Sequence, residues 1–235
     1  RLLRCERRNQ SGLDLAGDRR LGQDPQGQWP IRQRRPAVLD DCPPPTLGFP
    51  PARGGEDVLV YDEPDDGFFI SVDQSESGEF IVIHAGHHAS SETLLIPASN
   101  PTAAPVVFSP RAEDMLYSIT HWDGRWYVLT NADGAVDFKV MVADLNQTDR
   151  AHWREFTSHQ AGRYITGLSA TRDYLVRSER ENALPRVVIR HSSGEEHAIA
   201  LAEEAFNIEL IGGYEFDTTN QRYVYESPTT PMQWF

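Results

Sequence analysis

The chain has 235 residues, and its charge is divided unevenly along its length. Residues 1–55 carry a net charge of +4 and residues 56–235 a net charge of −17, which together give the −13 of the whole chain. Nucleic-acid binding needs clustered Lys and Arg, so the acidic main part argues against a nucleic-acid partner. No apolar run approaches the ~20 residues of a membrane helix, so no membrane partner is expected.

Residues 1–55 are predicted to be a basic segment rather than a folded domain. Arg, Gln, Gly and Pro dominate them, and the prolines at 43–45 and 50–51 interrupt regular structure. Cys5 and Cys42 are the only cysteines, and they form no CxxC pair. That usage fits a reducing compartment, so a cytoplasmic location is expected, and it does not suggest a metal framework.

From Glu56 onward, short β-branched and aromatic runs bounded by Gly, Asp, Asn and Pro predict a succession of β-strands in residues 56–235. The expected strands are Val58–Tyr61, Phe68–Val72, Phe80–His84, Thr93–Ile96, Val106–Phe108, Leu116–His121, Trp126–Thr130, Phe138–Val142, Tyr164–Ser169, Tyr174–Ser178, Val187–His191, His197–Leu201, Ile208–Ile211, Arg222–Glu226 and Met232–Phe235. No long amphipathic helix competes, and only Ala202–Ala205 suggests a helical turn.

Four of these strands begin a repeated pattern. The pattern begins at Phe69, Tyr117, Tyr164 and Asn207, at intervals of 48, 47 and 43 residues. A period of ~40–50 residues with about four strands per unit is typical of propeller blades. The predicted fold class is all-β: a partial β-propeller of four-stranded antiparallel blades, about three of them full, with parts of two more.

Local motifs give no catalytic, cofactor-binding or metal-binding residue. Asp133-Gly134 predicts a tight hairpin turn with positive φ angles. Gly167-Leu-Ser169-Ala-Thr171 is the nearest match to the GxSxG of a serine hydrolase, but Thr171 replaces the second Gly and no helix follows, so Ser169 is not expected to be a nucleophile.

Two further clusters are interpreted as loops. His84-Ala-Gly-His87-His88 has no second group at ligand spacing, which favours a solvated loop over a metal site. Asp62–Gly67 resembles a calcium loop, but Pro64 occupies a ligand position and strands flank it. Trp122, Trp126, Tyr127 and Trp153 are expected to form core between blades.

Several runs resemble the oligopeptidase B group of the prolyl oligopeptidase family of serine peptidases. The most specific are Asn131-Ala-Asp-Gly134 and Gly213-Tyr-Glu-Phe-Asp217, found in this order. Val60–Glu63, Phe68–Val72, Phe80–His84 and Thr229-Thr-Pro231 add to them. The resemblance covers residues 56–235, about three quarters of the chain.

The resemblance implies a propeller that caps an α/β-hydrolase domain and admits only short peptides, which are cleaved after Arg or Lys. It implies that the Ser, Asp and His of the triad belong to the hydrolase domain, so no catalytic residue has a matching position here and the chain alone is expected to be inactive. The expected partners are that hydrolase domain and short basic peptides, with no cofactor. The alternative is a free-standing propeller that serves as a protein-interaction module.

Overall fold

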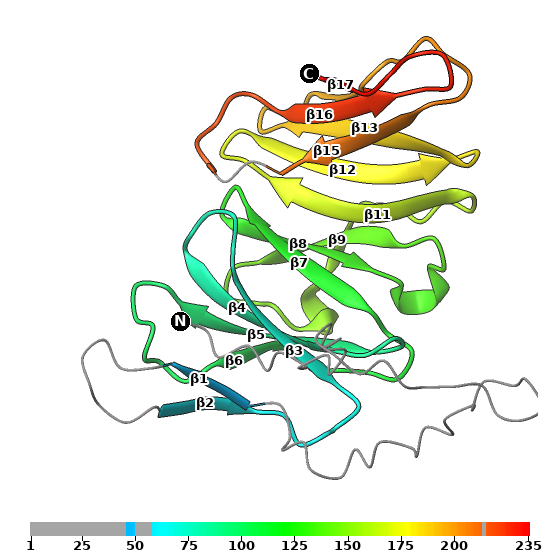
Figure 1. The fold of residues 1–235 in the computed structure, drawn as a ribbon. Coiled ribbons are helices and arrows are strands. Elements are labelled where there is room, and N and C mark those ends of the chain that lie inside the picture. The colour runs from blue at the N-terminus through cyan, green and yellow to red at the C-terminus, as the bar shows by residue number, and fades with distance from the viewer. Residues whose placement is uncertain (1–45, 50–57, 213–214) are drawn as a thin grey trace, which may run out of the picture. The chain divides into compact units, whose positions relative to one another are not determined.

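The computed structural model describes residues 46–49, 58–212 and 215–235 (Figure 1). The described residues fall into two compact units, one ending at Asp66 and the other running from Gly67 to Phe235. In the first unit β1 (Thr46–Phe49) pairs antiparallel with β2 (Val58–Asp62). β1 was not predicted. It lies inside the segment 1–55, and the other residues of that segment are outside the described part.

The second unit consists of four antiparallel sheets, each formed by strands that are consecutive in the sequence (Figure 1). The first sheet contains β3 (Phe69–Gln74), β4 (Phe80–Gly86), β5 (Ser91–Pro97) and β6 (Val106–Ser109). The second contains β7 (Tyr117–Trp122), β8 (Arg125–Thr130), β9 (Lys139–Asp144) and β10 (Arg154–Thr157). The third contains β11 (Arg163–Ala170), β12 (Tyr174–Glu181), β13 (Leu184–His191) and β14 (Glu196–Ala198). The fourth contains β15 (Asn207–Ile211), β16 (Arg222–Glu226) and β17 (Gln233–Trp234).

The predicted blade repeat is confirmed. β3, β7, β11 and β15 contain the four predicted pattern openers, and each is the first strand and one edge of its sheet. The partial propeller thus has three complete four-stranded blades in the second unit, a three-stranded sheet after them, and the two-stranded sheet of the first unit.

Apolar side chains fill the seams between neighbouring sheets of the second unit. Phe108 from the first sheet packs with Trp126 and Trp153 from the second. Trp122 and Tyr127 from the second sheet pack with Ile165 and leucine and alanine side chains from the third. The four predicted core aromatics, Trp122, Trp126, Tyr127 and Trp153, are all buried, as expected for side chains between blades.

Buried polar groups also connect the first two sheets. The hydroxyl of Tyr117 donates to the carbonyl oxygen of Ser109 at 2.6 Å and accepts the backbone N–H of Thr93 at 2.8 Å. The side chain of Ser91 donates to the carbonyl of Tyr117 at 3.0 Å and accepts its N–H at 2.7 Å. These bonds fix the start of β7 against β5 and β6.

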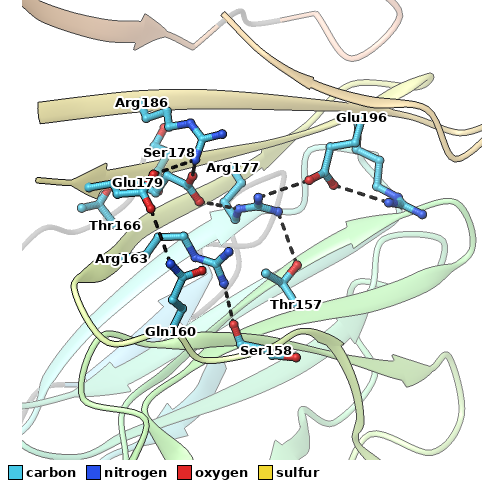
Figure 2. Close-up of polar contacts among 12 residues, drawn as sticks. Thr157, Ser158, Gln160, Arg163, Thr166, Arg177, Ser178, Glu179, Arg186 and Glu196 are labelled. Carbon is cyan, nitrogen blue, oxygen red and sulfur yellow. Dashed lines mark hydrogen bonds and ion pairs between the residues drawn. The ribbon is translucent and has the colours of Figure 1, made fainter.

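The seam between the second and third sheets contains an ion network (Figure 2). Arg177 on β12 donates to Glu179 at 2.7 Å, to Glu196 at 3.3 Å and, across the seam, to the hydroxyl of Thr157 on β10 at 3.3 Å. The side chain of Glu179 is fully buried, and Arg186 reaches it at 3.1 Å. Buried charges are tolerated when they are paired in this way.

Some local predictions were wrong. β10 and two short 3-10 turns, η1 (Ala132–Gly134) and η2 (Arg150–His152), were not predicted. Residues 202–205, expected as a helical turn, are irregular, with bends at 203–205. Asp133 and Gly134 do have positive φ angles, of 60° and 77°. They lie in the longer connection between β8 and β9 rather than in a tight two-residue turn. The reason is that Asn131 starts the 3-10 turn there, and its side-chain amide donates to the carbonyl of Asp114.

Candidate functional site

A cavity lies in the second unit, near the beginnings of the first strands. Its volume is about 480 Å³, and it is open to solvent. Its lining residues come from three neighbouring sheets and are Phe69, Ile70, Ser71, His84, Gly86, His87, His88, Ser91, Leu116, Tyr117, Ser118, Leu129, Phe138 and Thr166. We call this cavity the first-strand pocket. Its volume falls in the range that binds small ligands or parts of peptides.

One wall of the first-strand pocket is aromatic. Phe69, the first residue of β3, is 69% exposed although it is a large apolar side chain. Phe138 lines the pocket just before β9 and forms an edge-to-face contact with Tyr164 of β11, with 5.8 Å between ring centroids. The φ angle of Phe138 is 65°, an uncommon value for a bulky residue, which marks a backbone held by its surroundings.

The other wall contains three histidines. His84 is half-buried on β4, and burial lowers the pKa of its ring. His87 and His88 lie in the turn between β4 and β5, with 5.1 Å between their ring centroids. The solvated-loop interpretation fits His88, which is exposed, but it is wrong for His84, because β4 carries that side chain into the pocket wall.

No metal site is formed by these histidines. In the described ranges, no group of three or more His, Cys, Asp or Glu side chains is arranged to hold a metal ion. Asp62–Gly67, which resembles a calcium loop, spans the boundary between the two units. No site is therefore described there.

Ser169 is the serine of the nearest match to the GxSxG pattern. It lies within β11, where it pairs with Val176 of β12, and not at the sharp strand-to-helix turn that exposes a hydrolase serine.

One constellation superficially resembles a triad. Ser77 lies 2.7 Å from Nδ1 of His121, and Glu79 approaches the same Nδ1 at 3.9 Å. A triad needs the serine on one ring nitrogen and the carboxylate on the other. Both groups lie at Nδ1, so no carboxylate holds the ring from its other nitrogen and the arrangement is not a triad. It is a contact between the first and second sheets.

Comparison with known proteins agrees with the blade architecture. A family model described as "Prolyl oligopeptidase, N-terminal beta-propeller domain" matches residues 53–235. The chain belongs to the prolyl oligopeptidase family. It is 34% identical over 185 residues to dipeptidyl aminopeptidase BI from Pseudoxanthomonas mexicana, covering 79% of this chain and 25% of that protein. Protease 2 from Moraxella lacunata is 28% identical over 179 residues, covering 76% of this chain and 25% of that protein.

Solved structures show the same fold. Oligopeptidase B from Trypanosoma brucei matches with a TM-score of 0.74 and 21% identity, covering 80% of this chain and 28% of that one. Oligopeptidase B from Leishmania major matches with a TM-score of 0.70 and 22% identity, covering 77% and 27%. The chain spans about a quarter of the length of the curated relatives that it matches. It corresponds to part of the propeller domain of this family, as the sequence motifs predicted.

The residues of the first-strand pocket were not predicted as a site. Phe69 and Tyr117 were recognised only as residues that open the repeated strand pattern, and Phe138 as the start of a strand. The one signal in the sequence was that three of the four pattern openers, Phe69, Tyr117 and Tyr164, are aromatic. Only Phe69 and Tyr117 of these line the pocket, and Tyr117 is buried whereas Phe69 is exposed, so the repeat by itself does not mark the pocket.

Proposed function

We propose that the chain forms part of the propeller domain of an oligopeptidase B-like serine peptidase, and that the first-strand pocket contacts short peptides held between this domain and an α/β-hydrolase domain. The observation that carries the proposal is the place of the pocket. It lies where three successive blades bring their first strands together, and it presents the exposed ring of Phe69 and the half-buried ring of Phe138 in a fold of the prolyl oligopeptidase family.

The chemistry of the pocket suits contact with peptides rather than bond cleavage. Its wall offers the rings of Phe69 and Phe138, the backbone of the first strands, and the imidazoles of His87 and His88. Aromatic rings supply large contact areas at small entropic cost, and strand ends supply hydrogen-bonding groups for a peptide backbone. In this proposal the triad is contributed by the hydrolase domain.

The charge of the chain supports basic peptides as substrates. Residues 56–235 carry a net charge of −17, which raises the local concentration of cationic ligands. This attraction acts over about one Debye length and should weaken as salt is added. Among the described residues, no carboxylate lines the first-strand pocket itself, so charge is expected to attract the peptide and the aromatic wall to hold it.

Peptide binding by the purified 235-residue chain tests the proposal. A fluorescently labelled tripeptide with one aromatic and two Arg side chains should bind, and the Phe69→Ala variant should bind about tenfold or more weakly, because burying one aromatic side chain contributes about 1.5–3 kcal/mol. Val106→Ala is the matched control, since Val106 is 65% exposed but lies on β6, outside the pocket. Equal weakening by the two variants, or binding that does not change with salt, would count against the proposal.

A further inference from the structure

The turn between β4 and β5 is closed by the backbone N–H of His87, which donates to the carbonyl of Ser90 at 2.9 Å, and the side chain of His87 holds it further. Nδ1 of His87 accepts the backbone N–H of Ala89 at 2.9 Å and that of Ser90 at 3.2 Å. A nitrogen that accepts two N–H groups carries no proton, so the neutral ring has its proton on Nε2. His87 therefore does what Asn or Asp commonly does at the first position of a turn.

The turn is bonded to the connection between the first and second sheets. The hydroxyl of Ser90 donates to the carbonyl of Ala112 at 3.0 Å, and the N–H of Ser91 donates to the carbonyl of Met115 at 3.1 Å. The connection then enters β7 at Tyr117, and residues 116–118 line the first-strand pocket. Ser90 and Ser91 thus connect the turn to the segment that leads into the opposite side of the pocket.

The ring of His87 is also held by packing. It contacts Phe68, with 4.4 Å between centroids, and the guanidinium of Arg111 lies 4.0 Å from the centre of that same phenyl ring. Arg111 is in turn paired with Glu92 at 3.0 Å. The imidazole is therefore held by ring packing while its Nδ1 accepts the N–H groups of the turn.

We propose that His87 is a positioning residue whose Nδ1 sets the shape of the turn and, through the turn, the shape of the first-strand pocket. Loss of the Nδ1 acceptor would leave the N–H groups of Ala89 and Ser90 to water and would loosen the turn that Ser90 and Ser91 connect to residues 112–117. Peptide contact should weaken as a result; this last step rests on the proposed function, whereas the role of His87 in the turn does not.

Two substitutions separate the effect of the Nδ1 acceptor from that of the imidazole ring. His87→Asn keeps a side-chain acceptor that can reach the N–H groups two and three residues later, and it does not titrate near neutral pH. His87→Ala removes the acceptor. His191→Asn is the matched control, because Nδ1 of His191 accepts the N–H of Ser193 at 3.1 Å in the turn after β13, and neither residue lines the first-strand pocket.

Amide hydrogen exchange at Ala89 and Ser90, measured at a single pH, decides the proposal. His87→Ala should lose protection by about tenfold to thirtyfold relative to the unmodified chain, the factor expected for two hydrogen bonds of ordinary net strength. His87→Asn should keep most of the protection, and His191→Asn should behave as the unmodified chain. Full protection in His87→Ala, or the same loss in His87→Asn as in His87→Ala, would overturn the proposal.

Binding of the labelled tripeptide gives the second readout. Affinity should fall in His87→Ala and should change less in His87→Asn, which keeps the acceptor. An equal fall in both would overturn the link between the turn and the pocket. Absence of peptide binding in the unmodified chain and in every variant, with the exchange pattern as expected, would contradict the proposed function and leave the role of His87 in the turn established.

Discussion

Replacing Arg177 by Met should destabilise the second unit strongly. The Arg177 side chain is only 10% exposed, and its partner Glu179 is fully buried, with 2.7 Å between Nε and the carboxylate (Figure 2). Met fills much of the space of the arginine stem but leaves the Glu179 carboxylate facing Arg186, whose side chain is 42% exposed. The substitution also removes the hydrogen bond to Thr157 across the seam.

The expected loss is large for a single side chain. Removing one partner of a buried ion pair costs about 3–5 kcal/mol, because the remaining charge is left poorly compensated. Arg186 still compensates Glu179 in part, which favours the lower end. For a unit of this size, each 1 kcal/mol shifts the melting temperature by about 2–4 °C, so a fall of about 6–20 °C is predicted.

Thermal unfolding followed by circular dichroism gives the measurement, with Arg154→Met as the control. Arg154 pairs with Asp144 at 2.7 Å, but the two side chains are 56% and 47% exposed, and exposed pairs contribute only about 0–1 kcal/mol. The double variant Arg177→Met with Glu179→Leu should recover much of the lost stability. The buried carboxylate that Arg177→Met leaves without its arginine is then removed as well. If Arg177→Met melts at the same temperature as Arg154→Met, the argument that this seam depends on a buried ion network is refuted.

Two further substitutions test other seam contacts. Tyr117→Phe leaves the buried carbonyl of Ser109 and the N–H of Thr93 without the phenol and should cost about 1–3 kcal/mol in urea denaturation, whereas Tyr164→Phe, at an exposed ring, should cost much less. Burial raises the pKa of Tyr117 to about 12, so an alkaline absorbance titration should show this phenol ionising after the exposed tyrosines. Burial lowers the pKa of His121 while Glu79 opposes the shift, so folding favours the neutral ring, and the stability that this contributes should be lost as pH falls below the ordinary value of about 6.5. His121→Phe should reduce the difference between the melting temperatures measured above and below about pH 6.5. If the difference is as large as in the unmodified chain, other groups cause the pH dependence.

The blade repeat could be predicted because each blade must bury two faces against its neighbours. That demand places similar β-branched and aromatic runs at similar intervals, beginning at Phe69, Tyr117, Tyr164 and Asn207, and the structure begins its sheets at those strands. β10 was missed for the opposite reason. Its sequence, Arg154-Glu-Phe-Thr157, has no alternating apolar run, and its place as an edge strand is set by pairing with β9 rather than by its own composition.

The first-strand pocket could not be predicted because its walls are assembled from distant residues. Phe69, Phe138 and Thr166 come from three sheets, and the positive φ angle of Phe138 has no signature in the sequence. The role of His87 is equally hidden, because a histidine in a short turn gives no sign that its Nδ1 accepts backbone N–H groups. Only the structure distinguishes His87, whose Nδ1 accepts two backbone N–H groups, from the exposed His88 beside it.

Photo-crosslinking tests the central claim most directly, namely that the pocket where the first strands meet is the part of this chain that contacts peptide. A short basic peptide with one photoreactive phenylalanine analogue would be irradiated with the purified chain, and the labelled residues located by mass spectrometry. The account predicts labels at Phe69–Ser71, His87–His88 and Phe138, reduced by an excess of unlabelled peptide. Labels concentrated on the edge strand β6, or at turns such as Gly124 and Gly194 outside the pocket, would contradict it.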